Sequence, residues 1–324
     1  MSLLLWIIVF VVSVTILIKA ANVFTENSEK LGIALGVPAF IVGLTIVSIG
    51  TSLPELATAF IAVFKGASEV VAANAIGSNI ANILLIIGVA AVLARVLEVK
   101  RDLINLDLPL LVGSAIILFF VAQDGMITFP ESIILIIGYI IYIFYTLYFK
   151  EKVTEDALNK KEFVKGVVGK NKNKKKTEWK TVALIVVSAF FIYLGAEYTI
   201  ESLVKMAGIL GIGSSVIAMS ALAVGTSLPE LVVSVGAVLK GKHEIGIGNI
   251  VGSNIFNTFV VIGFPGLFSR LTIDQNTLYL GIPFFIAATL LFVFSGISRK
   301  IYSWEGMIYL LIFVLFVSKL FNLF

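Results

Sequence analysis

The chain contains one seven-residue segment twice, as Gly50-Thr51-Ser52-Leu53-Pro54-Glu55-Leu56 and as Gly225-Thr226-Ser227-Leu228-Pro229-Glu230-Leu231. The two copies lie 175 residues apart. The same offset aligns Gly77-Ser78-Asn79-Ile80 with Gly252-Ser253-Asn254-Ile255, and Asn82 with Asn257. Because 20 of the 39 positions from residue 50 to residue 88 are identical in the second copy, the chain contains an internal duplication.

The composition is that of a membrane protein. Hydrophobic residues make up 59% of the 324 residues and charged residues 14%, which is more apolar side chain than the interior of a soluble fold holds. Ten apolar runs are long enough to cross a hydrocarbon layer of about 30 Å as helices. They lie near 2–20, 37–64, 70–95, 103–122, 129–149, 180–200, 211–239, 245–268, 277–297 and 303–322. The chain has no cysteine and one histidine, which excludes disulfides, thiolate metal sites and histidine-rich metal sites.

The order of these runs predicts two inverted repeats. Five runs separate each motif from its copy, and because five is odd, the copies must cross the membrane in opposite directions. We therefore expect an all-α polytopic membrane protein of ten transmembrane helices in two inverted five-helix repeats. The first repeat is expected at 1–149, a linker at 150–179 and the second repeat at 180–324. Inverted repeats are typical of secondary transporters, whose substrate site lies near the bilayer midplane where broken helices meet.

The distribution of basic residues predicts the orientation. Residues 150–180 hold 11 of the 24 Lys and Arg residues. If the linker is cytoplasmic, 20 of the 24 lie inside, as the positive-inside rule expects. We therefore expect a multi-pass protein of the plasma (cell) membrane with both termini outside and the basic loop in the cytoplasm. The lysine cluster at 170–176 could bind nucleic acid or anionic lipid, but we interpret it as a topology signal and expect no nucleic-acid partner.

Each copy of the first motif places a glutamate directly after a proline. In a helix, Pro54 cannot donate to the carbonyl oxygen of Gly50 and its ring crowds that oxygen, so the backbone opens there. Such a break survives in a membrane only where it is buried in protein or lines a polar cavity. Pro229 and Glu230 repeat the arrangement that Glu55 begins. Hydroxyl groups are added by Thr51, Ser52, Thr226 and Ser227. Together these groups form an all-oxygen shell suited to a hard cation such as calcium.

A structural interpretation of the same motif is a capped or kinked helix. Ser52 and Glu55 have the spacing of a capping box, and an isolated Thr-Ser-x-Pro segment in a membrane helix is most often a kink. However, a carboxylate deep inside an apolar span costs at least ~3 kcal/mol. The chain accepts that cost twice at equivalent positions, which favours a functional site.

The second motif adds polar residues to the third and eighth expected spans. Asn82 and Asn257 fall near the middle of their apolar runs, and Ser78 and Ser253 lie four residues earlier on the same helical face. These side chains can face the glutamates, although small and amide residues could equally serve close helix packing. Asn249, which recurs from the first repeat in the same way, is compatible with either a vestibule or packing.

The paired motifs in two inverted halves resemble the alpha repeats of the calcium/cation antiporter superfamily, most clearly those of prokaryotic sodium/calcium exchangers. The resemblance covers nearly all of the chain outside the basic linker. It implies that Glu55 and Glu230 bind calcium together with the backbone at Thr51 and Thr226. It also implies further oxygen ligands for the competing sodium ions, namely the hydroxyls of Ser52, Ser78, Ser227 and Ser253 and the backbone oxygens of Ser48 and Ala223. Asn82 and Asn257 would complete the centre.

One departure from the family pattern concerns the driving ion. Many members carry Asp where this chain has Asn257, so only two central carboxylates remain here. Two negative charges balance one calcium ion and could be neutralised by two protons as well as by sodium. We expect sodium as the counter-ion, with a proton/calcium exchanger using the same two glutamates as the alternative.

Two other classes of membrane protein are less compatible with the sequence. A channel would also line its path with oxygen ligands, but inverted repeats with broken central helices favour alternating access. An intramembrane enzyme would need a nucleophile or metal ligands that the symmetric glutamates do not offer. We therefore expect a transporter with no cofactor, whose partners are the lipid bilayer, calcium and the counter-ion. The oligomeric state is left open.

Overall fold

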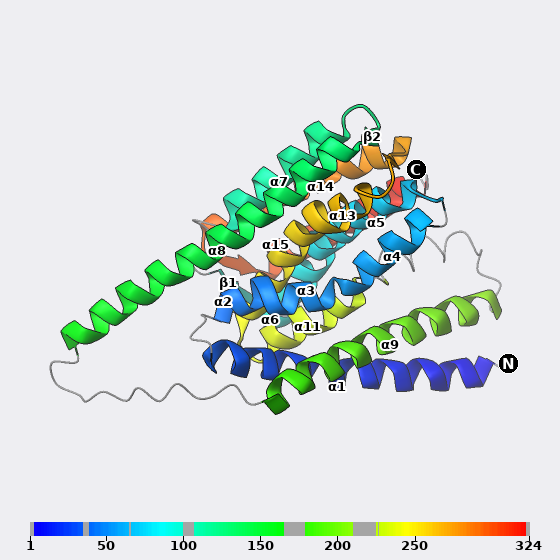
Figure 1. Ribbon diagram of the computed structural model, residues 1–324. Helices are drawn as coiled ribbons and strands as arrows, with labels where there is room; N and C mark the ends of the chain where they lie inside the picture. The colour runs from blue at the N-terminus through cyan, green and yellow to red at the C-terminus, as the bar shows by residue number, and fades with distance from the viewer. Residues whose placement is uncertain are drawn as a thin grey trace.

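The computed structural model describes residues 3–34, 39–64, 66–99, 107–164, 179–209, 225 and 227–321, which form a helical bundle with two small sheets (Figure 1). The first half of the chain forms α1 (Leu3–Ala34), α2 (Ala39–Val42), η1 (Gly43–Val47), α3 (Ser48–Thr51), α4 (Leu53–Phe64), α5 (Glu69–Ile80), η2 (Ala81–Ile87), α6 (Gly88–Ala94), β1 (Val96–Glu98), α7 (Leu108–Ala122), β2 (Met126–Ile127) and α8 (Phe129–Val164). The second half forms α9 (Trp179–Ile209), α11 (Leu228–Leu239), α12 (His243–Phe256), η4 (Asn257–Val261), α13 (Gly263–Gly266), β3 (Leu271–Thr272), η5 (Thr277–Gly281), α14 (Ile282–Ile297), β4 (Lys300–Tyr302) and α15 (Ser303–Leu320). The segments labelled η are π-helical and have a wider turn than an α-helix.

The helices have the lengths and composition of membrane spans. Among the described residues, seven helices are long and apolar enough to cross a membrane, or eight if the bent pair at 43–51 and 53–64 is one span. Two shorter apolar helices, α7 and α11, lie where the fourth and seventh spans are expected. The residues that precede them, 100–106 and 210–224, lie outside the described part of the chain. The expectation of an all-helical polytopic membrane protein is confirmed.

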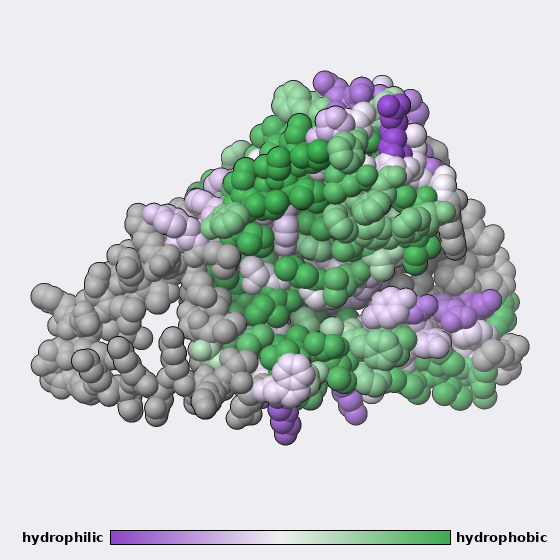
Figure 2. Space-filling view, viewed as in Figure 1, coloured by the Kyte–Doolittle hydropathy of each residue, from purple (hydrophilic) through white to green (hydrophobic). Residues whose placement is uncertain are grey.

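The surface is apolar, as a protein surrounded by lipid requires. Figure 2 shows hydrophobic residues over much of the described part of the face in view, with hydrophilic residues gathered mainly at its edges. Phe144, Phe294 and Leu311 expose 70%, 68% and 68% of their surface. Soluble proteins rarely expose apolar patches of such extent, so these helix faces contact lipid.

The two small sheets display the inverted symmetry of the repeats. Strand β1 pairs with β4, with Val96 opposite Tyr302, and β2 pairs with β3, with Ile127 opposite Leu271. The offset of 175 residues takes Val96 to Leu271 and Ile127 to Tyr302, so it converts one sheet into the other with the same register. The sheets lie toward opposite ends of the bundle (Figure 1). Equivalent parts of the two repeats therefore lie at opposite ends, as inversion requires.

The helices of the first and sixth expected spans form a pair beside the rest of the bundle. Helices α1 and α9 lie side by side and pack mainly on each other (Figure 1). Two salt bridges join α1 to the turn before α12. Lys240 Nζ lies 3.0 Å from Glu26 Oε1, and Lys242 pairs with Glu29. The pair is therefore tied to the other helices at one end by charged contacts.

The expected linker at 150–179 is helical in its first part. Helix α8 continues without interruption from its apolar half to Val164. Residues 165–178 lie outside the described part, and α9 begins at Trp179.

A glycine allows the broken second span to pack closely on α12. A Cβ atom added to Gly252 would lie 2.4 Å from the carbonyl oxygen of Leu44 in η1 and 2.6 Å from Oγ of Ser48 in α3. At the equivalent position of the first repeat, a Cβ atom on Gly77 would have no described atom within 4 Å. The close approach of α12 to the broken helix therefore requires a residue without a side chain at Gly252, whereas the residues equivalent to Leu44 and Ser48 in the second repeat lie outside the described part of the chain.

We expect Gly252→Ala to lower the melting temperature of the detergent-solubilised protein, and Gly77→Ala to leave it unchanged or raise it. Overpacking costs about 1–3 kcal/mol, whereas alanine at an open helical position gains up to about 1 kcal/mol over glycine. Thermal unfolding followed by intrinsic fluorescence would measure both variants. Equal melting temperatures would contradict the tight contact at Gly252.

Candidate cation site

The first Pro-Glu motif interrupts its helix, as the sequence predicts, and the second lies at the start of α11, directly after residues outside the described part of the chain. Ser52 lies between α3 and α4 with φ −91° and ψ 5°, and the helices on either side are bent by 45°. Ser227 precedes α11 with nearly the same dihedral angles, −87° and 5°. The interruption is at Ser52 rather than at Gly50, because α3 continues past that glycine. Glu55 and Glu230 lie in the first turns of α4 and α11, each directly after a proline.

The two glutamate side chains are buried within electrostatic range of each other. Glu55 and Glu230 both have no exposed surface, and the charge of Glu230 acts on Glu55. Neither forms a salt bridge with a lysine or arginine in the part of the chain that the structure describes. Two buried like charges without a basic partner are strongly unfavourable. The pair therefore requires a bound cation or protons.

The serine hydroxyls at the breaks do not cap their own helices. Ser52 Oγ donates a hydrogen bond of 2.9 Å to Oε1 of Glu230, which belongs to the other repeat. The Ser227 side chain makes no capping bond, and neither carboxylate oxygen of Glu55 has a hydrogen-bond partner. The hydroxyl of Ser253 lies beside the Glu230 carboxylate. The capping-box interpretation of Ser52 and Glu55 is therefore wrong.

Several expected ligands present buried oxygen atoms that no protein group satisfies. These atoms are Oε1 and Oε2 of Glu55, Oε2 of Glu230, Oγ of Ser227, and Oδ1 of Asn82 and Asn257. Buried polar atoms are nearly always hydrogen-bonded, and each one left unsatisfied costs about 1–3 kcal/mol. These atoms come from both repeats and belong to two carboxylates and three neutral side chains, and the Nδ2 atom of Asn257 likewise has no partner among the described residues. Within the described residues, no cluster of three or more His, Cys, Asp or Glu side chains could hold a metal ion. Neutral oxygens would therefore complete the shell of a hard cation.

The two central asparagines lie at transitions from α-helix to π-helix. Asn82 lies in η2, which follows α5, and Asn257 is the first residue of η4, which follows α12. Both side chains are fully buried, as are Ser78 and Ser253 one turn earlier. π-Helical turns within α-helices occur frequently at functional sites. The wider turn displaces these asparagines from regular α-helical spacing.

Helices α5 and α12 meet at a reciprocal pair of asparagines. Asn79 Nδ2 donates to the carbonyl oxygen of Asn254 at 3.3 Å, and Asn254 Nδ2 donates to the carbonyl oxygen of Asn79 at 3.4 Å. Asn79 Nδ2 also donates to Thr258 Oγ1 at 3.0 Å, and Asn82 Nδ2 donates to Asn254 Oδ1 at 2.9 Å. Because Asn79 and Asn254 are equivalent in the duplication, this contact relates the two repeats symmetrically.

Asn249 joins the broken second span to α11. Its Oδ1 accepts a hydrogen bond of 3.1 Å from Thr51 Oγ1, and its Nδ2 donates one of 2.8 Å to Ser234 Oγ. The Ser48 carbonyl oxygen accepts from Ser253 Oγ at 3.5 Å. The Thr51 hydroxyl and the Ser48 carbonyl, which both belong to residues of the expected site, therefore have hydrogen-bond partners within the protein. Of the two roles open to Asn249, lining a vestibule or packing between helices, the contacts favour a structural link between helices.

Two of the expected site residues, Thr226 and Ala223, lie outside the described residues. The structure buries all of the others, namely Glu55, Glu230, Thr51, Ser52, Ser227, Ser78, Ser253, Asn82, Asn257 and Ser48. It adds contacts that the sequence did not assign. Asn79, Asn249 and Asn254 could have been found from their recurrence at the repeat offset, whereas Ser234 and Thr258 do not recur and gave no such signal.

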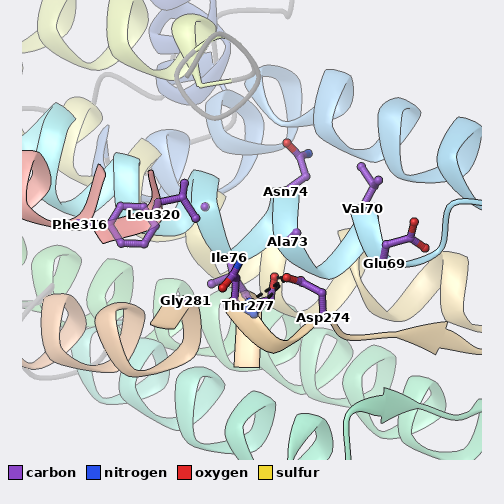
Figure 3. Close-up of a pocket in the computed structure, with 12 residues that line it drawn as sticks. Glu69, Val70, Ala73, Asn74, Ile76, Asp274, Thr277, Gly281, Phe316 and Leu320 are labelled. Atoms are coloured by element: carbon purple, nitrogen blue, oxygen red, sulfur yellow. Dashed lines mark hydrogen bonds between the residues drawn. The ribbon is translucent and has the colours of Figure 1, made fainter. Parts of the chain in front are cut away.

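A separate cavity of about 260 Å³ lies between α5, η5 and α15 (Figure 3). Its lining includes apolar side chains such as Phe316 and Leu320, and two acidic residues, Glu69 and Asp274. The Asp274 carboxylate accepts a hydrogen bond of 3.3 Å from the backbone nitrogen of Thr277 and so caps η5. Because neither buried glutamate lines this cavity, it is distinct from the site around Glu55.

Comparison with known proteins places these features in one family. The family model described as sodium/calcium exchanger protein matches residues 5–148 and 180–321. The chain is 33% identical to the sodium/calcium exchanger MaX1 of Methanosarcina acetivorans, over 97% of this chain and 98% of that protein. It is 30% identical to the inner membrane protein YrbG of Escherichia coli, over 82% of this chain and 80% of that protein.

A solved structure has the same fold. The sodium-calcium exchanger NCX_Mj, soaked with sodium and no calcium, superposes with a TM-score of 0.83 at 26% sequence identity, covering 98% of this chain and 100% of that one. The same exchanger soaked with sodium and calcium superposes with a TM-score of 0.81. The matched segments include both copies of the duplicated motifs. The chain is a multi-pass membrane transporter rather than an enzyme, and it belongs to the sodium/calcium exchanger family.

Proposed function

We propose that this protein exchanges calcium for sodium at one buried site, with Glu55 and Glu230 as its charged ligands. The main support is that two buried carboxylates from opposite repeats meet without a basic partner. Their joint charge balances one calcium ion or two monovalent ions. Unsatisfied oxygens of Ser227, Asn82 and Asn257 supply neutral ligands. Similarity to MaX1, a sodium/calcium exchanger by name, supports the same pair of ions.

Competition for the two carboxylates couples the ions. Calcium uses both Glu55 and Glu230, so sodium binds only after calcium has left, and each ion crosses in turn. The hydroxyls of Ser52, Ser78, Ser227 and Ser253, with backbone oxygens at Ser48, Thr51, Ala223 and Thr226, serve as the remaining ligands. The gradient of one ion then drives transport of the other.

Alternating access moves the site between the two sides of the membrane. Inverted repeats with broken central helices open to one side at a time. Helices α1 and α9 pack mainly on each other and lie beside the helices that hold the glutamates (Figure 1). We assign the sliding motion to this pair, while α4, α5, α11 and α12 keep the ion ligands together.

The protein resides in the cell membrane with the loop at 150–179 in the cytoplasm and both termini outside. The basic residues support this orientation, because 20 of the 24 then lie inside. The N-terminal end of α1 and the C-terminal end of α15 lie toward the same side of the bundle, away from the end of α8 (Figure 1). The relative YrbG is named an inner membrane protein.

The proton is the second candidate for the driving ion. Asn257 stands where many family members have an acid, so the site holds only two carboxylates, and two protons would neutralise both. The serine hydroxyls favour sodium, because a proton needs only the carboxylates.

Replacing either glutamate should abolish transport. In Glu55→Gln or Glu230→Gln a single carboxylate faces a divalent ion, and losing one partner of a buried charge interaction costs about 3–5 kcal/mol, a decrease of at least about 100-fold. Counter-ion-driven uptake of calcium-45 into reconstituted vesicles measures this effect. Glu69→Gln, which removes an exposed glutamate of the same repeat, should transport normally. Near-normal uptake by either central variant would remove that residue from the site.

The driving ion can be identified with serine variants. An outward sodium gradient at matched pH should drive calcium uptake, and the double variant Ser78→Ala with Ser253→Ala should weaken sodium-driven uptake several-fold. Ser114→Ala, which removes a buried serine of α7, is the matched control. Calcium uptake driven fully by a pH gradient without sodium, tolerant of the serine changes and not increased by added sodium, would establish the proton instead.

Single cysteines test the orientation, since the chain has no cysteine of its own. In intact cells, Asn171→Cys in the basic loop should be protected from a membrane-impermeant thiol reagent, and Gln123→Cys between α7 and α8 should react. Gln123 is exposed and precedes the left-handed Gly125, so the substitution introduces no backbone strain. Reversed labelling would invert the orientation, and equal labelling of both positions would contradict the odd number of spans between them.

A further inference from the structure

We propose that Asn254 is a positioning residue of the cation site: its side-chain oxygen holds the amide nitrogen of Asn82 and so turns the Asn82 oxygen toward the cation. This inference rests on the proposed function, because it concerns a ligand of the same site. It extends that function to a residue whose own side chain does not contact the ion.

An asparagine can serve a cation in only one of its two amide orientations. Its Oδ1 atom is a ligand, whereas its Nδ2 atom has two N–H donors and repels a cation. The two orientations are nearly equal in shape, so packing alone does not select between them. An acceptor that holds the amide nitrogen therefore selects the orientation in which the oxygen can serve as a ligand.

Asn254 is that acceptor for Asn82. The distance from Asn82 Nδ2 to Asn254 Oδ1 is 2.9 Å, and Asn82 Oδ1 has no hydrogen-bond partner. Both side chains have no exposed surface, so bulk water cannot replace the contact. The Asn82 oxygen is thus left as an oriented buried acceptor, as a cation ligand requires.

The orientation of Asn254 is itself fixed by the other repeat. Its Nδ2 donates to the carbonyl oxygen of Asn79 at 3.4 Å, and its own carbonyl oxygen accepts from Asn79 Nδ2 at 3.3 Å. The backbone of α5 therefore orients Asn254, and Asn254 orients Asn82. A cation on Asn82 Oδ1 polarises the amide and strengthens its donation to Asn254, because hydrogen bonds in a chain reinforce one another.

The duplication provides a residue in the same position without this contact. Asn79 is equivalent to Asn254, and Asn257 is equivalent to Asn82. The corresponding bond is not formed, since Asn79 Oδ1 and Asn257 Nδ2 both have no partner. Asn79 shares the burial of Asn254 and its reciprocal backbone contact, and it differs in not holding a ligand.

The test compares Asn254→Leu with Asn79→Leu, because leucine has nearly the branched shape of asparagine and lacks its hydrogen bonds. Each variant loses one half of the reciprocal contact, but only Asn254→Leu releases Asn82. Calcium-45 uptake into sodium-loaded vesicles is measured over a range of calcium concentrations, together with the melting temperature. We expect KM for calcium to rise about 3- to 10-fold in Asn254→Leu, the range of one net hydrogen bond. We expect it to stay within about twofold in Asn79→Leu, while both variants lose similar thermal stability.

Two further variants separate orientation from folding. In an Asn82→Ala background, adding Asn254→Leu should not raise KM again, because the ligand it positions is gone. Asn254→Asp keeps the acceptor and should not raise KM, even if Asn254→Leu proves too unstable to purify. Additive effects with Asn82→Ala, an equal rise in Asn79→Leu, or a rise in Asn254→Asp would each overturn the inference. Wild-type vesicles without sodium-driven uptake would instead contradict the proposed function.

Discussion

Two buried carboxylates of like charge, Glu55 and Glu230, lie within electrostatic range of each other, and neither forms a salt bridge with a basic side chain among the described residues. In water such a pair would be solvated, but neither side chain has any exposed surface. Instead of a permanent positive charge, the surrounding protein supplies polar atoms that can bind a positive ion. A lysine in this place would neutralise the pair and leave no charge for a transported cation. The lack of a fixed partner is therefore what allows different cations to occupy the site in turn.

The helix breaks and the polar residues around them follow from this requirement. An uninterrupted apolar helix cannot bring a glutamate side chain, the neighbouring backbone oxygens and a hydroxyl group to one point. At Ser52 and Ser227 the break does so within a single turn, and proline makes the break unavoidable because it cannot donate to the preceding turn. Asparagine and serine complete the environment with uncharged oxygens. The amide nitrogen of Asn82 is bound by Asn254 and the Thr51 hydroxyl by Asn249, so the oxygen of Asn82 remains as an acceptor.

The two repeats are symmetric at the periphery and asymmetric at the centre. The sheets β1–β4 and β2–β3 obey the repeat offset residue by residue. Near the glutamates, Ser52 donates to Glu230 whereas Ser227 has no partner, and Asn82 is bound whereas Asn257 is not. Nearly identical sequences thus adopt two hydrogen-bonding arrangements in one molecule. A protein that exposes its site to each side in turn needs two conformations of similar energy.

The sequence by itself determined the membrane class and the duplication, and it predicted the inverted sense of the repeats and the candidate site, because apolar length, an odd number of spans and a proline beside a glutamate are local properties of the chain. Only the tertiary structure decided which donor meets which acceptor. The Ser52–Glu230 and Asn82–Asn254 bonds join residues far apart in the sequence. The motif spacing of Ser52 and Glu55 was equally compatible with a capping box, which these two residues do not form in the structure. Hydrogen bonds between repeats depend on how closely two helices approach, and that distance is set by packing at residues such as Gly252, where an added Cβ atom would lie 2.4 Å from the carbonyl oxygen of Leu44.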